Sequence, residues 1–158
     1  MKMENGKLST DNIIEKLNRE ELKIASIYKR AISMTIDDFL VSFLIIIAFY
    51  DSFINAKTYE EIMILTDKLF IFIFIAYSLY HWIFVALYGK TIGKMIMKIK
   101  VIDVESFDKP THFRALIRSI VRNFDEMFFY LGMLYAIIDP LNRAIHDIAG
   151  RVVVVEDN

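Results

Sequence analysis

Two long apolar stretches stand out in the pattern of hydrophobic and polar positions along the chain. Residues 69–88 (LFIFIFIAYSLYHWIFVALY) contain no Asp, Glu, Lys or Arg, a composition typical of a membrane-spanning helix. Residues 31–50 form a stretch of similar length that includes two adjacent carboxylates, Asp37 and Asp38. Because a helix of about 20 predominantly apolar residues crosses the hydrocarbon core of a bilayer, both stretches are predicted to be transmembrane helices.

Shorter patterns predict two strands. Residues from about 95 to 103 alternate in part between apolar and basic side chains, and residues 151–156 (RVVVVE) contain a β-branched run, so each segment is predicted to be a strand. We expect the two strands to pair as a small β-hairpin, because a lone strand would leave its backbone groups unsatisfied. The pairing requires the C-terminus to lie on the same side of the membrane as residues 95–103.

Between these strands the sequence predicts a short helical hairpin. Residues 113–122 (FRALIRSIVR) place Arg114, Arg118 and Arg122 on one face of a helix, with apolar residues on the other, which is typical of a helix in the interface plane. Residues 127–138 (MFFYLGMLYAII) are apolar but short for a span. The hairpin around residues 124–139 is therefore either re-entrant or a third span with the C-terminus outside, and the strand pairing favours the first alternative.

The distribution of charge predicts the orientation. Residues 51–67 hold four acids and one Lys, whereas residues 89–122 hold eight Lys or Arg against three acids, so the positive-inside rule places the N-terminus and residues 89–122 in the cytoplasm. The predicted fold class is an all-α integral membrane protein with two long transmembrane helices, the short helical hairpin and a small cytoplasmic β-hairpin.

The chain is predicted to divide near residue 24. Residues 1–24 are expected to form an N-terminal cytoplasmic segment with a short amphipathic helix that begins at about Asn12, with Glu15 completing a capping box. Residues 25–158 are expected to form the membrane domain. The first 30 residues contain no apolar core of a cleaved signal peptide, so the first span is expected to act as its own insertion signal.

Composition narrows the function classes. A net charge of −1 gives no electrostatic case for nucleic-acid binding, and the absence of cysteine excludes disulfides and thiolate metal sites. His81, His112 and His146 lack the spacing of metal ligands, and no nucleophile–base arrangement is visible. The sequence therefore predicts no enzyme, no cofactor and no metal centre. The arginine face of residues 113–122 is expected to contact anionic lipid headgroups.

Ionisable side chains within the two apolar stretches are the candidate site. A carboxylate inside a bilayer costs a few kcal/mol, so Asp37 and Asp38 are expected to face a helix-bundle interior. Arg30 and Asp37 are two turns apart on one helix face, and His81 lies at a similar depth, about 10–12 Å from the inner boundary. Tyr77 lies one turn from His81. We predict a polar cluster of Asp37, His81 and Tyr77, with Arg30 and one of the three arginines nearer the cytoplasm.

Two functions are compatible with such a cluster. Burial and a neighbouring cation shift the pKa of a carboxyl in opposite directions, so the cluster can take up and release a proton or small cation, as a transporter or ion/proton-coupled translocator requires. A path would then require a homo-oligomer, because two or three spans enclose little volume. The alternative is a non-transport membrane scaffold in which the Arg/Asp network is structural. Asp147 is expected to pair with Lys94 or an arginine of residues 113–122, and so to tie the cytoplasmic part to the spans.

Several motifs resemble those of the RDD family of membrane proteins. Arg30 and Asp37, in RAISMTID, resemble its first-helix Arg and Asp. Asp147, in HDIAGRVVVV, resembles its second Asp. Further similar positions lie in the G-x-T-x-G-K segment and in the arginine-bearing helix: Gly89, Thr91, Gly93, Lys94, Arg114 and Arg118. Asp38 is an additional acid, and Arg151 stands where a small residue such as Thr is more usual.

The resemblance covers residues 25–155, nearly the whole chain. It implies a multi-pass protein of the bacterial cytoplasmic membrane, in a family whose members are suspected of transport. A cation or small ligand is then a candidate for the bound species.

Overall fold

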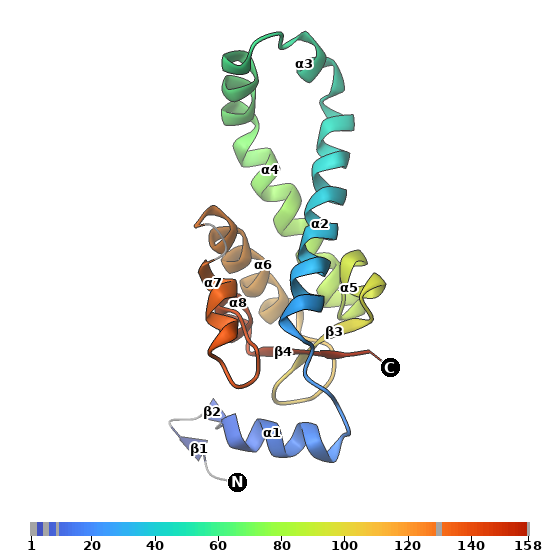
Figure 1. Cartoon of the computed structure of the whole chain (residues 1–158), viewed down its shortest axis with the longest axis vertical. Coiled ribbons are helices and arrows are strands. Elements are labelled where there is room, and N and C mark those ends of the chain that lie inside the picture. Colours follow the sequence, from blue (N-terminus) through green and yellow to red (C-terminus); the bar gives the residue numbers. More distant parts are fainter. Residues whose placement is uncertain (1–2, 5–6, 9, 129–130, 158) are drawn as a thin grey trace.

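Two long helices rise from a base that contains the sheet and most of the shorter helices (Figure 1). The computed structural model describes residues 3–4, 7–8, 10–128 and 131–157. Helices α2 (Ile27–Ala48) and α4 (Tyr59–Tyr88) are both long and apolar enough to cross a membrane. They are linked at the end far from the base by α3 (Tyr50–Asn55). The prediction of two long apolar helices is confirmed.

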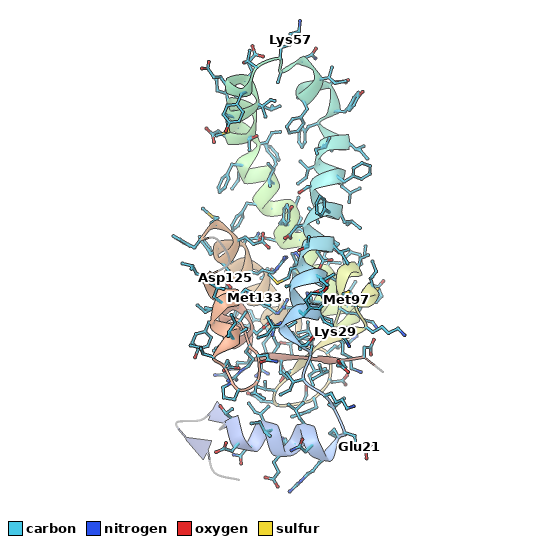
Figure 2. All side chains as sticks on the ribbon, in the orientation of Figure 1. Glu21, Lys29, Lys57, Met97, Asp125 and Met133 are labelled. Carbon is cyan, nitrogen blue, oxygen red and sulfur yellow. The ribbon has the colours of Figure 1, made fainter. Side chains whose placement is uncertain are left out.

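Helix α4 begins ten residues before the predicted boundary at residue 69. The Thr58 side chain accepts a hydrogen bond from the backbone N–H of Glu61, and the Glu61 carboxylate accepts one from the backbone N–H of Thr58. This reciprocal capping box starts the helix within a polar segment, where hydropathy alone gives no signal. Figure 2 shows Lys57, just before this cap, at the end of the molecule opposite the base.

The base contains a two-stranded antiparallel sheet, and here the sequence-based boundaries need correction. Strand β3 covers Ile99–Asp103, not 95–103, because Ile92–Ile96 form helix α5. The Thr91 side chain accepts a hydrogen bond from the Lys94 backbone N–H and caps α5. Lys98, with φ of 52°, then turns the chain into the strand. The partial alternation of apolar residues between 95 and 98 therefore belongs to a helix end.

Strand β4 (Val152–Glu156) pairs with β3, with Val101 opposite Val154, so the predicted pairing of these two segments is present. The C-terminal strand therefore lies on the same side of the two long helices as β3. Both faces of the sheet are covered. On one face, the sheet packs against α4 and α6. The buried residues of this cluster come from the sheet (Ile99, Val101, Val152 and Val154), from α4 (Val85 and Ala86) and from α6 (Ala115).

Helix α1 (Thr10–Arg19) covers the other face of the sheet, where Ile13 and Leu17 pack against Ile102 and Val153. The helix starts earlier than predicted, so Asn12 lies inside it and is not its cap. The acidic Asp11 in the first turn favours this earlier start. A second pair of short strands, β1 (Met3–Glu4) and β2 (Lys7–Leu8), precedes α1.

The segment between β3 and β4 is a bent helical hairpin. Helix α6 (His112–Met127) packs along the lower half of α4, and α7 (Leu131–Leu134), a 3₁₀ turn (Tyr135–Ile137) and α8 (Ile145–Ala149) return to β4. Over residues 131–157 no helix is long enough to span a bilayer. Of the two alternatives, the structure therefore matches the hairpin that turns back, although residues 129–130 of that segment lie outside the described residues.

Gly93 marks the close approach of α5 to α2. A Cβ atom at this position would lie 2.1 Å from the carbonyl oxygen of Ser33 and 2.9 Å from Cγ of Asp37. We predict that Gly93→Ala lowers the free energy of unfolding by on the order of 3 kcal/mol, because backbone cannot yield as a side chain does. Thermal unfolding in detergent checks this, with Ile96→Ala, an exposed position on the same helix, as the control. Equal melting temperatures for the two variants would contradict the packing described here.

Candidate functional site

Three groups of buried polar side chains lie where α2, α4, α5, α6 and α8 meet. The first, the Asp147 network, consists of Asp147, Arg30 and Arg118. The Arg30 guanidinium and Arg118 Nε donate to the two carboxylate oxygens of Asp147, the latter at 2.9 Å. The backbone N–H of Ala144 donates to the same carboxylate at 3.1 Å. This network ties α2, α6 and α8 together, and each of its three charged side chains is at most 3% exposed.

Opposite charge determines the ionisation of Asp147. Burial raises the pKa of its carboxyl, but the positive charges of Arg30 and Arg118 more than offset burial, and the pKa lies well below its usual range. Asp147 is therefore a permanent anion at neutral pH. Its pairing with Arg118 is the kind of tie that the sequence led us to expect.

The second group, the Asp37 network, holds α2 against the end of α4 and against α5. Asp37 is fully buried, and its carboxylate accepts hydrogen bonds from the Tyr80 hydroxyl at 2.7 Å, the Thr91 hydroxyl at 2.6 Å and the Gly93 backbone N–H at 2.8 Å. The Lys94 ammonium lies 3.9 Å away. Burial, followed by the charge of Arg118, lowers the pKa of Lys94 to about 7. Asp37 is thus surrounded by donors supplied by the G-x-T-x-G-K segment.

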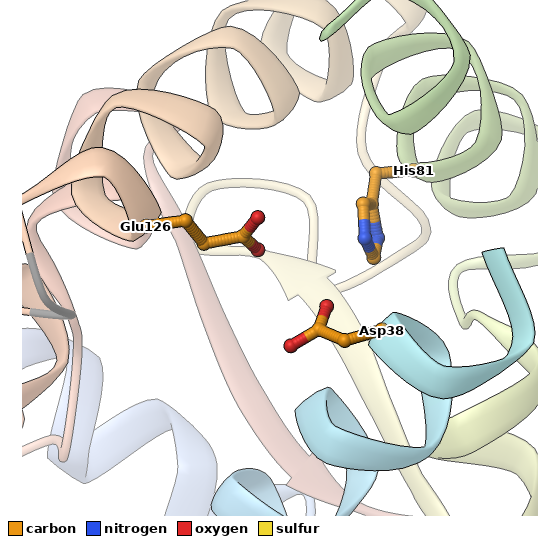
Figure 3. Close-up of side chains that lie close together, drawn as sticks. All are labelled: Asp38, His81 and Glu126. Carbon is orange, nitrogen blue, oxygen red and sulfur yellow. The ribbon is translucent and has the colours of Figure 1, made fainter. Parts of the chain in front are cut away.

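The third group, the His81 cluster, consists of Asp38, His81, Arg122 and Glu126. Arg122 Nη2 lies 3.1 Å from Asp38 Oδ1 and 2.7 Å from Glu126 Oε1, so one guanidinium bridges two carboxylates. Asp38, His81 and Glu126 each place one candidate ligand atom within 4.8 Å of the others. Figure 3 shows these three side chains, from α2, α4 and α6, pointing toward one another. Burial raises the pKa of Glu126 to about 7, although the charge of Arg122 opposes the shift.

The His81 cluster differs from the other two networks in its unsatisfied groups. His81 is fully buried, and the described residues offer neither of its ring nitrogens a hydrogen-bond partner. The same holds for Arg122 Nε and Nη1 and for Glu126 Oε1, whose contact with Arg122 lacks hydrogen-bond geometry. An unsatisfied buried polar group costs about 1–3 kcal/mol. Buried polar groups in folded proteins are usually satisfied, and this concentration of exceptions sets the His81 cluster apart from the other two networks.

An apolar groove of about 660 Å³ runs along α2 beside the His81 cluster. Asp38 and Ser42 contribute polar atoms to its wall, and the remainder is mostly apolar: Ala31, Met34, Thr35, Phe39, Phe43, Ile46 and Met133. Because Asp38 belongs to both the groove and the cluster, the groove reaches the cluster at this carboxylate.

The structure distributes the predicted polar cluster over all three groups. Arg30 pairs with Asp147, and Asp37 lies in its own network, whereas His81 faces Asp38. The Tyr77 hydroxyl contacts the hydroxyl of Ser42 at 2.8 Å and donates to the Asp38 backbone carbonyl at 3.1 Å. Tyr77 therefore supports α2 beside the cluster. Among the described residues, its hydroxyl interacts with Ser42 and Asp38 and not with the His81 ring.

The three arginines of α6 are turned toward the protein and away from a lipid surface. Arg118 and Arg122 belong to two of the networks, and Arg114 pairs with Asp103 and, at 2.8 Å, with Glu105. The exposed face of α6 instead carries apolar side chains: Phe113, Ile120, Phe124 and Met127. The helix and its single basic face are present, and the described partners of its arginines are acids of the same chain.

Glu126 is the member of the cluster that the sequence analysis missed. It follows Arg122 by one helical turn, a spacing at which opposite charges pair. That signal is present in the sequence, but the sequence analysis assigns Glu126 no role.

Comparison with known proteins gives one match. The model of the RDD family matches residues 24–151 of the chain, which include all three networks. No curated protein and no solved structure matches.

We predict that Asp147→Asn lowers the free energy of unfolding by about 3–5 kcal/mol, because it leaves two buried arginines without their anion. Glu15→Gln is the matched control, since Glu15 also pairs with an arginine but its side chain is 61% exposed, and an exposed pair contributes little. Melting temperatures of both variants in the same detergent measure the difference. A melting temperature of Asp147→Asn equal to that of wild type would show that the Asp147 network is not a structural tie.

Proposed function

Because the chain belongs to the RDD family, we propose that it is a multi-pass protein of the bacterial cytoplasmic membrane that moves a small inorganic cation across the bilayer through the His81 cluster. The observation that carries the proposal is the contrast between satisfied and unsatisfied buried charges. Asp37 and Asp147 have several donors each, whereas His81 and Arg122 bury nitrogens without partners. A purely structural network would be expected to satisfy those groups.

The charge of the His81 cluster supports a cation as the transported species. Two carboxylates share one guanidinium, so the cluster carries one net negative charge when both acids are ionised. Ionisable groups inside apolar helices are expensive, and where they occur they commonly mark ion pathways.

The apolar surface supports placement in a bilayer. Large apolar side chains are exposed along both long helices, among them Phe39, Phe43 and Phe72. Apolar exposure continues over the outer faces of α6, α7 and α8, for example at Phe128 and Leu131. We propose that α2 and α4 span the membrane and that the α6–α8 hairpin is embedded beside them. Two spans enclose little volume, so the pathway requires a homo-oligomer.

A non-transport scaffold is the second candidate, and a specific observation favours it. The Asp37 and Asp147 networks together join α2 to α4, α5, α6 and α8 through satisfied contacts, which is what a structural role requires. The two roles are compatible within one molecule if different residues perform them. Neither proposal includes an enzymatic activity or a nucleic-acid partner.

We predict that residues 89–122 and the C-terminal strand face the cytoplasm and that the α3–α4 link faces outward, because the positive charge is concentrated in the base. The chain contains no cysteine, so single cysteines report their own accessibility. In intact cells, a membrane-impermeant maleimide should label Lys57→Cys, whereas Ser106→Cys should react only after permeabilisation. The reverse labelling pattern would invert the proposed orientation.

We predict that Asp38→Asn abolishes cation flux in proteoliposomes while its melting temperature stays close to that of wild type. Asp37→Asn is the matched control: it removes a carboxylate from the adjacent position, but one that accepts three hydrogen bonds between elements, so it should lower stability. Flux is measured for Na⁺, K⁺, Li⁺, Mn²⁺ and Co²⁺, with at least a 10-fold loss expected for the permeant ion.

The absence of flux for all five ions in the wild-type protein would refute the transport proposal and leave the scaffold. Flux that Asp38→Asn retains at wild-type level would show that ions move by a route that avoids the His81 cluster.

A further inference from the structure

We infer that Asp38, His81 and Glu126 form a binding site for a divalent first-row transition-metal ion. The inference rests on the proposed function in so far as it names the class of cation that is transported. The binding site itself stands on geometry and can be tested without transport.

The three side chains provide a suitable set of donors. Their candidate ligand atoms, one imidazole nitrogen and two carboxylate oxygens, all lie within 4.8 Å of one another. Bonds of about 2.0–2.2 Å place two ligands of one such ion roughly 3–4 Å apart. The most widely separated donors therefore need to converge by up to about 1–2 Å, a shift within reach of side-chain rotation in Asp38 and Glu126.

His81 points to a ligand independently of the carboxylates. Its ring is fully buried, lies among Asp38 and Glu126 in Figure 3, and has no hydrogen-bond partner at either nitrogen within the described ranges. A neutral imidazole with one free lone pair is the commonest metal ligand in proteins. Coordination would satisfy a nitrogen that the surrounding residues leave unsatisfied.

Arg122 is compatible with a metal ion in this position. It contacts Asp38 at Oδ1 and Glu126 at Oε1 through Nη2, and a carboxylate that meets a guanidinium at one oxygen can still coordinate an ion. Ligating carboxylates in metal sites usually accept hydrogen bonds from other groups, which fix their orientation. Arg122 is therefore a positioning residue that holds the two acids on either side of the ion.

The donor set selects the class of metal. Hard cations such as Na⁺, Mg²⁺ and Ca²⁺ take oxygen ligands, whereas imidazole together with carboxylates suits Mn²⁺, Fe²⁺, Co²⁺ and Zn²⁺. Three protein ligands leave coordination positions open, as in sites that exchange ligands and unlike closed structural sites.

Binding of Co²⁺ to the full-length protein, without an affinity tag and in lipid nanodiscs, tests the inference. We expect one Co²⁺ per chain, a visible d–d absorption band that excess Mg²⁺ does not remove, and a higher melting temperature with the metal. His81→Gln should abolish the band and raise the Kd at least 10-fold, and Glu126→Gln should weaken binding in the same direction. His112→Gln is the matched control, because His112 is an exposed histidine at the start of α6.

The outcomes separate the two proposals. Wild-type protein that binds no Co²⁺, or binding that His81→Gln and Glu126→Gln leave unchanged, overturns the metal site. Loss of the band in His112→Gln instead of His81→Gln assigns binding to the surface and also overturns it. Co²⁺ binding at the His81 cluster in a protein that transports no ion upholds the site and refutes transport. Flux of Na⁺ in a protein that binds no Co²⁺ upholds transport and overturns the metal site.

Discussion

The structure depends on the requirement that each charge buried among its helices finds an opposite charge or hydrogen-bond donors. Asp147 illustrates this most clearly, since it is fully buried between Arg30 of α2 and Arg118 of α6. Breaking one partner of such a pair leaves the others uncompensated. The pairing therefore fixes how α2, α6 and α8 sit relative to one another, and the sheet then closes the base, with α1 covering its other face.

The two adjacent aspartates of α2 belong to different networks because successive residues on a helix point about 100° apart. Asp37 faces α5 and the end of α4, where Thr91, Gly93 and Tyr80 donate to it. Asp38 faces α6 and His81. The sequence analysis left open whether the intramembrane acids serve transport or lock the fold. The structure suggests that this choice applies to each acid separately, with Asp37 in the structural position and Asp38 beside the unsatisfied groups.

Sequence patterns predicted the elements whose signals are local. The two long apolar helices, the antiparallel pairing of the C-terminal run and the single basic face of residues 113–122 all come from periodicity or composition along the chain. The partners of that face could not be predicted, because Asp103, Asp147 and Asp38 approach it from distant parts of the sequence. Helix α5 was missed because five residues are too few to show a helical period. The three donors of the His81 cluster come from three helices. A pattern of metal-ligand spacing along the sequence therefore could not predict them.

The Asp37 and Asp147 networks hold in place the helices that carry the His81 cluster. A metal or ion site needs its ligands held within a fraction of an ångström, and buried ligands without partners tend to collapse onto whatever polar group is nearest. The Asp37 network fixes the rotation of α2, and the Asp147 network fixes α6 against α2, so Asp38 and Glu126 face His81 from rigid helices. Arg122 contacts both carboxylates beside the imidazole ring. The residues that resemble the RDD pattern, Arg30, Asp37 and Asp147, thereby lie in the supporting networks, whereas Asp38, His81 and Glu126 form the proposed site. A change in the support should move the site as a whole, whereas a change in the site leaves the support intact.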